Sequence, residues 1–136
     1  MSKAFVKMFV TVPAAPMTRG IDGVTFENPL QSLLDELDKL STQSVGVIGD
    51  YDNVSFTFAK GRSRYRTIPG SDAHPTAGKI GELHSEDEPV VVFTAPKDQL
   101  DTVIATIRDH HPYEMPASTC SSWCESRAMG WLNLTC

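Results

Sequence analysis

LDTVIATIRDHHPYEMPA, residues 100–117, is the stretch that decides the fold of this chain. In its first half, apolar side chains recur at the spacing i, i+3, i+4 and i+7, which predicts an amphipathic helix. The helix cannot continue through the second half, because Pro112 has no N–H group and favours extended dihedral angles at His111. We therefore expect a helix over residues 96–110, followed by a stiff segment with polar and aromatic side chains. The apolar stripe consists of Leu100, Val103, Ile104 and Ile107.

A second stretch has the same apolar spacing. Asn28 is a good N-cap residue, Pro29 suits the first helical position, and Gln31 stands where a capping box has its second member. These features predict a helix over residues 28–41 whose leucines pack against a sheet. The leucines of this stripe are Leu30, Leu33, Leu34 and Leu37.

Extended segments surround both helices. Residues 3–12 are rich in β-branched and aromatic side chains, and residues 90–93 form an apolar run that suits a central strand. Residues 54–58 alternate apolar and polar side chains and predict a half-buried strand, which residues 61–66 either extend or follow as another strand. Residues 69–89 are rich in Gly, Pro and acidic residues, so we expect a loop there with at most one short strand.

The order of these elements repeats along the chain. Each half has an apolar strand, a helix with the four-point stripe, and a further extended segment. A doubled β-α-β pattern predicts an α+β, ferredoxin-like fold, in which an antiparallel sheet carries two helices on one face. An all-parallel sheet would need another helix between the strands at residues 54–58 and 90–93, and the Gly- and Pro-rich sequence there cannot supply one.

The composition is that of one soluble domain. The chain has 136 residues, 40% of them hydrophobic and 21% charged, and a formal net charge of −5, which disfavours nucleic acid as a partner. No apolar run approaches the roughly 18 residues that span a bilayer, and Lys7 interrupts the apolar N-terminal segment. We therefore expect no membrane partner and a cytoplasmic location. Cys120, Cys124 and Cys136 lie within the last 17 residues, which is not the pattern of a disulfide framework or a zinc site.

Three motifs occur in a specific order: GDYDNVSF at residues 49–56, PTAGKIGEL at residues 75–83 and HPYEMPA at residues 111–117. Together they resemble the YqfO-type, PII/CutA-like domain that is inserted in many proteins of the NGG1p-interacting-factor (Nif-three-like) family, also called GTP cyclohydrolase I type 2 homologues. The similarity covers residues 3–117, and this chain looks like a standalone version of the insert. Full-length members carry a two-metal site in the surrounding domain, whose ligands have no positions here to be mapped onto.

The resemblance implies a ferredoxin-like, PII/CutA-like domain over residues 1–117, assembled as a homotrimer through sheet edges, with small-molecule or metal ligands in clefts between subunits. Met115 and Ser63 depart from the family pattern, which has a glutamate and a glycine at these positions. After Ala117 the resemblance ends. We therefore expect residues 118–136 to form a divergent C-terminal tail, which is either a divergent final strand or a product of altered splicing or gene prediction.

The sharpest candidates for a ligand site are His111, Tyr113 and Glu114. Prolines restrain their backbone, so imidazole and carboxylate could be held in the preset geometry that metal ligation or acid–base chemistry needs. The structural alternative is that His111 caps the preceding helix as an imidazolium, because a cation is favoured at a helix C-terminus, while Tyr113 packs.

A second group of candidates is basic. Arg62, Arg64 and Arg66 share one strand face at period two and could bind a phosphate or polyanion. The alternative is an edge strand that its charges protect from aggregation. Tyr51, in the first motif, completes the predicted ligand-binding residues. No serine or cysteine nucleophile has a supporting motif, so no catalytic residue is predicted, and neither a metal nor a cofactor can be named.

Two functions remain open at this stage. The first is a non-enzymatic, oligomeric binding or regulatory module like the PII and CutA proteins. The second is a metal-assisted hydrolase of nucleotides or related phosphates, as the larger family implies. Because the metal-bearing domain has no counterpart in this sequence, the first is favoured. A divergent or truncated gene product with little function of its own is a third interpretation, which the tail prompts.

Overall fold

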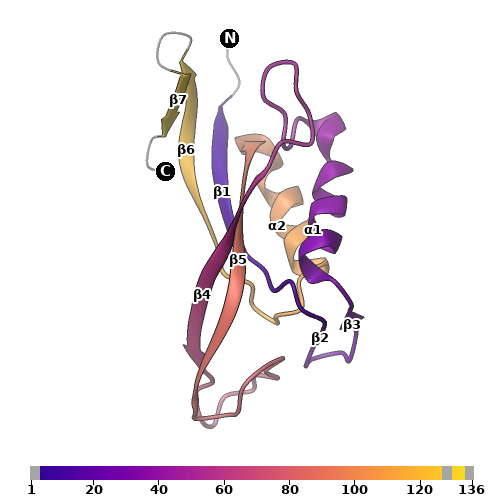
Figure 1. Cartoon of the computed structure of the whole chain (residues 1–136), viewed down its shortest axis with the longest axis vertical. Helices are drawn as coiled ribbons and strands as arrows, with labels where there is room; N and C mark the ends of the chain where they lie inside the picture. The colour runs from indigo at the N-terminus through magenta and orange to yellow at the C-terminus, as the bar shows by residue number, and fades with distance from the viewer. Residues whose placement is uncertain (1–3, 127–129, 134–136) are drawn as a thin grey trace.

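The computed structural model describes residues 4–126 and 130–133, and side chains up to residue 121. In this part of the chain, five antiparallel strands form one sheet in the order β4-β5-β1-β6-β7 (Figure 1). β1 therefore lies in the centre, between two strands that come much later in the sequence. The strands are β1 (Phe5–Thr11), β4 (Phe56–Arg66), β5 (Leu83–Pro96), β6 (Ser118–Ser126) and β7 (Gly130–Asn133). Two short strands, β2 (Met17–Thr18) and β3 (Thr25–Phe26), pair separately.

Two α-helices, α1 (Pro29–Asp38) and α2 (Leu100–Asp109), lie on one face of the sheet (Figure 1). Short 3-10 turns follow α1 at Ser41–Gln43 and precede α2 at Lys97–Gln99. This arrangement confirms the ferredoxin-like, α+β prediction. The core lies between helices and sheet, because the buried side chains of both helical stripes and of alternate strand positions meet there. It contains Val6, Met8, Val10, Val12, Leu33, Leu37, Val45, Val91, Phe93, Ala95, Val103 and Ile107.

The start of α1 follows the sequence prediction in part. The Asn28 side chain accepts a hydrogen bond from the Gln31 N–H at 3.2 Å, so Asn28 is the N-cap. The predicted return bond of a capping box is wrong, because the Gln31 side chain donates to Asp35 at 2.8 Å.

The prediction of a loop with at most one short strand over residues 69–89 is wrong in its last third, because the 14-residue strand β5 begins at Leu83. Its first half alternates in burial, but the inward side chains are polar, so no apolar periodicity marked the strand. Its partner β4 also lacks apolar periodicity in its last part. β4 continues through residues 61–66, which was one of the two alternatives predicted from the sequence. A register shift between Phe58 and Gly61 separates its two parts.

Residues 118–126 form β6, which pairs with β1 from Val10↔Ser118 to Phe5↔Trp123. This part of the predicted tail therefore belongs to the sheet, and Cys120 packs half-buried against the core. The boundary at residue 117 stays a prediction. Cys124 and Cys136 lie outside the residues whose side chains are described.

No helix in residues 4–126 or 130–133 is long and apolar enough to cross a membrane. The helices cover one face of the sheet, and the opposite face, called the open face below, carries the alternate residues of β1, starting with Phe5 and Lys7.

Candidate functional site

The predicted ligand-binding segment borders a cavity of about 540 Å³, the end cleft, which lies between the last part of β4, the loop that follows it and the chain after α2. Of the predicted site residues, Tyr113, Glu114, Arg64 and Arg66 line it. The full lining is Thr11, Ser63, Arg64, Tyr65, Arg66, Thr67, Ile68, Ser71, Ala73, Pro75, Thr76, Tyr113, Glu114, Met115 and Ala117.

His111 lies beneath this cleft and is 0% exposed. Its Nε2–H donates to the Thr11 carbonyl at 2.6 Å, and its Nδ1 accepts from the Tyr113 N–H at 3.1 Å. These partners fix one neutral tautomer, because a carbonyl can only accept and an amide N–H can only donate. Burial lowers the pKa of His111 below its ordinary value, in agreement with a neutral ring. His111 thus joins β1 to the segment after α2 and has no free nitrogen for a ligand.

The cation at the end of α2 is Arg19, from the loop between β2 and β3. Its guanidinium donates to the carbonyl oxygens of Arg108, Asp109 and His111 at 3.4, 3.3 and 3.2 Å. Asp22 holds the guanidinium from the other side at 2.8 Å. The interpretation of His111 as an imidazolium cap is therefore wrong, since a residue about ninety positions earlier neutralises the helix terminus.

Tyr113 is anchored by Glu88, a carboxylate that is only 1% exposed. The Tyr113 hydroxyl donates to one oxygen of Glu88, and the Ser63 hydroxyl donates to the other at 2.5 Å. Burial and the hydrogen bond to Glu88 raise the pKa of Tyr113 far above its ordinary value, so its phenol stays protonated. Glu88 was not predicted from the sequence, because an acidic run such as residues 86–88 is typical of a solvated loop. Only the alternation of exposed and buried residues along β5 distinguishes Glu88 from its acidic neighbours.

Glu114 and its neighbours connect the same segment to the loop of the second motif. The Glu114 carboxylate accepts from the His74 N–H at 3.0 Å, and the Thr76 hydroxyl donates to the Pro112 carbonyl at 2.6 Å. On the cleft wall, the Tyr65 hydroxyl donates to the carbonyl of Ala77 at 3.0 Å. The second and third motifs therefore meet in space, and their polar groups largely satisfy one another.

The arginine stripe is on the exposed side of β4, with Tyr65 opposite, as its period of two predicts. Arg62 donates to the Ser85 hydroxyl at 2.6 Å, and Arg66 donates to the Gly81 carbonyl at 2.9 Å. Arg64 has no hydrogen bond or ion pair within the described residues. Arg62 lies outside the end cleft.

Tyr51 is separated from these residues. It is exposed, on a turn closed by a bridge between Ile48 and Tyr51, and lines neither of the cavities described here. The structure thus brings together Tyr113, Glu114, Arg64 and Arg66, and leaves His111, Tyr51 and Arg62 outside the end cleft.

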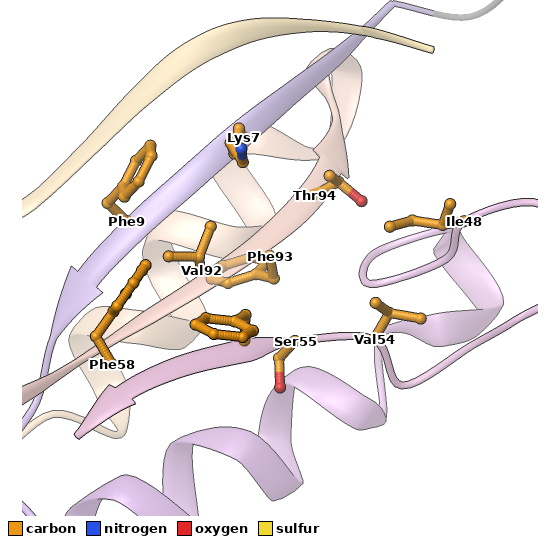
Figure 2. Close-up of a pocket in the computed structure, with 10 residues that line it drawn as sticks. Lys7, Phe9, Ile48, Val54, Ser55, Phe58, Val92, Phe93 and Thr94 are labelled. Atoms are coloured by element: carbon orange, nitrogen blue, oxygen red, sulfur yellow. The ribbon is translucent and has the colours of Figure 1, made fainter. Parts of the chain in front are cut away.

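A second cavity, of about 390 Å³, lies on the open face and is called the face cleft (Figure 2). This cavity was not predicted from the sequence. Phe56 and Phe58 at its rim are 61% and 52% exposed, with ring centroids 4.9 Å apart. Its lining is Lys7, Phe9, Ile48, Val54, Ser55, Phe56, Phe58, Val92, Phe93 and Thr94.

Within residues 4–126 and 130–133, no three His, Cys, Asp or Glu side chains gather in a way that could hold a metal ion. Among the described residues, His84 Nε2 lies 2.8 Å from the Glu86 carboxylate.

The chain is similar to curated proteins called "GTP cyclohydrolase 1 type 2 homolog" from several strains of Staphylococcus aureus, strain Mu50 among them. The identity is 32% over 79 residues, which is 58% of this chain. This chain matches only 21% of the length of those relatives. No family model matches the chain.

Solved structures show the same fold. A Bacillus cereus protein related to NIF3 superposes with a TM-score of 0.65 at 19% identity, over 90% of this chain and 26% of that one. CutA1 from Ehrlichia chaffeensis gives a TM-score of 0.56 at 13% identity, over 93% of this chain and 88% of its own. CutA1 from Oryza sativa gives 0.59 at 12% identity, over 93% and 86%. Together with the curated relatives, these structures confirm the resemblance that the three motifs carry: the chain is a NIF3-like, CutA-like domain.

Proposed function

We propose that this chain is a non-enzymatic, homo-oligomeric binding or regulatory module, assembled as a trimer. The observation that carries this proposal is the pair of exposed aromatic side chains, Phe56 and Phe58, on the open face of β4. β4 is an edge strand of 11 residues within the described sheet. The first part of this edge strand exposes two large apolar rings, which is a liability in a monomer, and a second copy that packs there would remove both rings from water.

A closed ring of copies satisfies every such edge. Edge-to-face contact between copies is heterologous, since one copy presents a surface that differs from the surface it receives. Heterologous contacts leave no edge exposed only when the copies close into a ring. The smallest ring of this kind has three copies, because a two-fold pair uses the same surface on both copies. The likeness in fold to CutA1 and the sequence resemblance to PII/CutA-like domains favour three.

The ligand site of this module is the end cleft, with Tyr113, Glu114, Arg64 and Arg66 as its binding residues. Its volume of about 540 Å³ is within the range of small-molecule sites. Among the charged side chains of its lining, Arg64 has no protein partner in the described residues, so it is available to an anionic substituent. His111 takes part indirectly, because it holds the backbone of Tyr113.

Light scattering with size-exclusion chromatography tests the assembly. We expect a trimer at tens of micromolar, and we expect Phe58→Ser to dissociate it, because the substitution removes an exposed ring from the contact. Tyr51→Ser is the matched control, since Tyr51 is an exposed aromatic residue whose side chain does not line the face cleft. A wild-type monomer, or equal effects of the two substitutions, would contradict the proposal.

The hydrolase alternative rests on the name of the curated relatives, of whose length this chain spans 21%. Elemental analysis of purified protein, before and after treatment with a chelator, separates the two functions. Metal retained at one equivalent or more per chain would favour the hydrolase. We expect less than that, with no change in oligomeric state on chelation.

A further inference from the structure

The open face places a polar row of side chains directly beside an apolar row. Lys7 and Thr94 are register partners across β1 and β5, so their side chains share this face and lie close together. Two residues along, Phe9 pairs with Val92, which pairs in turn with Phe56. All five residues line the face cleft. A ligand there would meet a charged end and an apolar end at a fixed separation.

Thr94 has a hydroxyl with an unmet hydrogen-bonding capacity. The residue is 2% exposed, and its Oγ1 has no hydrogen-bond partner in the described part of the chain. Its backbone is satisfied, because the Gly46 N–H donates to the Thr94 carbonyl at 2.7 Å. A buried hydroxyl normally has a partner, so the Thr94 hydroxyl is available to a polar atom of a bound ligand.

Lys7 supplies a charge to the same place. Its side chain is half-buried on the open face, and it has no hydrogen bond or ion pair among the described residues. An ammonium group has three donors and no acceptor, so Lys7 and Thr94 together can donate to one anionic group. Figure 2 shows the two side chains on neighbouring strands, with Phe9 and Val92 beside them.

The far wall of the cleft comes from the loop before β4. The Val54 N–H donates to the Gly46 carbonyl at 2.8 Å, and Ile48 is held by paired hydrogen bonds with Tyr51 at 2.8 and 2.9 Å. The side chains of Ile48 and Val54 line the cleft beyond the edge of β5 (Figure 2). Most of the lining side chains are therefore apolar, and Lys7 and Thr94 add the polar row.

We propose that the face cleft binds a small monocarboxylate with an aromatic or branched apolar body. The carboxylate accepts hydrogen bonds from the Lys7 ammonium and the Thr94 hydroxyl, and the apolar body lies on Val92 between Phe9 and Phe56. A single lysine with one hydroxyl suits a group with one negative charge better than a phosphate with two, and a cavity of about 390 Å³ suits a small ligand.

This inference rests on the proposed function, since it gives the binding module a ligand class at a site other than the end cleft. If the copies meet over the open face, the ligand lies at the boundary between subunits. The competing occupant is the second copy itself, whose side chains would then fill the cleft.

The test uses the intact chain with 3-phenylpropionate as probe and 3-phenylpropan-1-ol as its uncharged counterpart, titrated by calorimetry. We expect the acid to bind at least about tenfold more tightly than the alcohol, as one charge-assisted contact implies. Lys7→Met keeps the apolar stem and should abolish this preference. Lys79→Met, which changes an exposed lysine outside the cleft, should leave it intact.

Thr94→Val gives an independent test, because it should stabilise the free protein and weaken the binding of the acid. Removal of a buried hydroxyl without a partner should raise the melting temperature of the free protein, while the acid should bind several-fold more weakly. Equal binding of acid and alcohol, or wild-type preference in Lys7→Met, would overturn the inference.

Two further outcomes separate this inference from the proposed assembly. If neither probe binds while Phe58→Ser dissociates the oligomer, a second copy fills the cleft: the ligand class is then wrong and the assembly stands. If the protein is a monomer that binds the acid through Lys7, the assembly is wrong and the ligand class stands.

Discussion

His111 gives the fold a defined dependence on pH. Its ring is buried and neutral, and burial depresses its pKa in the folded state below the ordinary value of about 6.5. In the unfolded chain the ring takes up a proton near pH 6.5, while in the folded chain it resists protonation to lower pH. The unfolded state therefore binds more protons between the two pKa values, and stability falls as the pH drops through this window.

We expect the urea midpoint of unfolding to decrease from about pH 7.5 to about pH 5.5, and His111→Gln to show a smaller decrease. Glutamine can keep a donor near Thr11 but cannot take up a proton. His74→Gln serves as control, because His74 is exposed and should leave the pH dependence unchanged. A wild-type midpoint that is flat over this range would mean that His111 is not held neutral.

The partners of the HPYEMPA segment show how far single residues could be predicted. Two prolines and a run of polar side chains predict that residues 111–117 form a restrained segment. The structure agrees, because His111, Tyr113 and Glu114 each have a specific hydrogen-bond partner. The partners themselves were not predictable. Glu88 and Thr11 are distant in sequence, and a buried glutamate in an acidic run has the same local signature as a solvated one.

At the scale of elements, the two helices were the most predictable part of the fold, because each buries one stripe. The members of each stripe differ in burial. Leu33 and Ile107 are 0% and 2% exposed. Leu34 and Ile104 are half-buried, at the margin of the stripes. The period of the stripe predicts the face of each helix, but tertiary packing decides how deeply each member lies.

Truncation of the central positions should therefore cost more than truncation at the margin. We expect Leu33→Ala and Ile107→Ala each to lower the free energy of unfolding by about 2–5 kcal/mol, and Ile104→Ala to lower it by less. Urea denaturation at constant m-value measures each difference. If Ile104→Ala were the most destabilising of the three, the margin of α2 would have to be packed more deeply than described.

The strands were less predictable than the helices. β5 was recognised only in its apolar second half, where Val91 and Phe93 reach the core. In its first half the inward residues His84, Glu86 and Glu88 are polar and bind other polar groups, so hydrophobic periodicity has no signal there. Much of the end cleft depends on this half of β5 and on its pairing with β4, so the cleft could not be derived from the sequence.

At the scale of the whole molecule, the open question is whether residues 1–117 are a domain. β6 pairs with β1 over six register positions, from Val10↔Ser118 to Phe5↔Trp123. Deletion of everything after Ala117 would leave one edge of the central strand unpaired.

We therefore expect the chain truncated after Ala117 to unfold at a clearly lower temperature than the full chain, or to aggregate. Circular dichroism melts of the two proteins, at equal concentration, measure the difference. A truncated protein with an unchanged, cooperative melt would instead support the boundary at residue 117, and β6 would be dispensable to the fold.

The central position of β1 has a consequence for how the chain is made. Both neighbours of this strand, β5 and β6, begin more than seventy residues after it ends. During synthesis, β1 leaves the ribosome before the other strands of this sheet, and its apolar side chains stay unburied until β5 and β6 have been made. Long loops must close before β1 can pair with either neighbour, and closing them costs chain entropy before any strand pairing offsets it. We therefore expect the sheet to form slowly, after the chain is released.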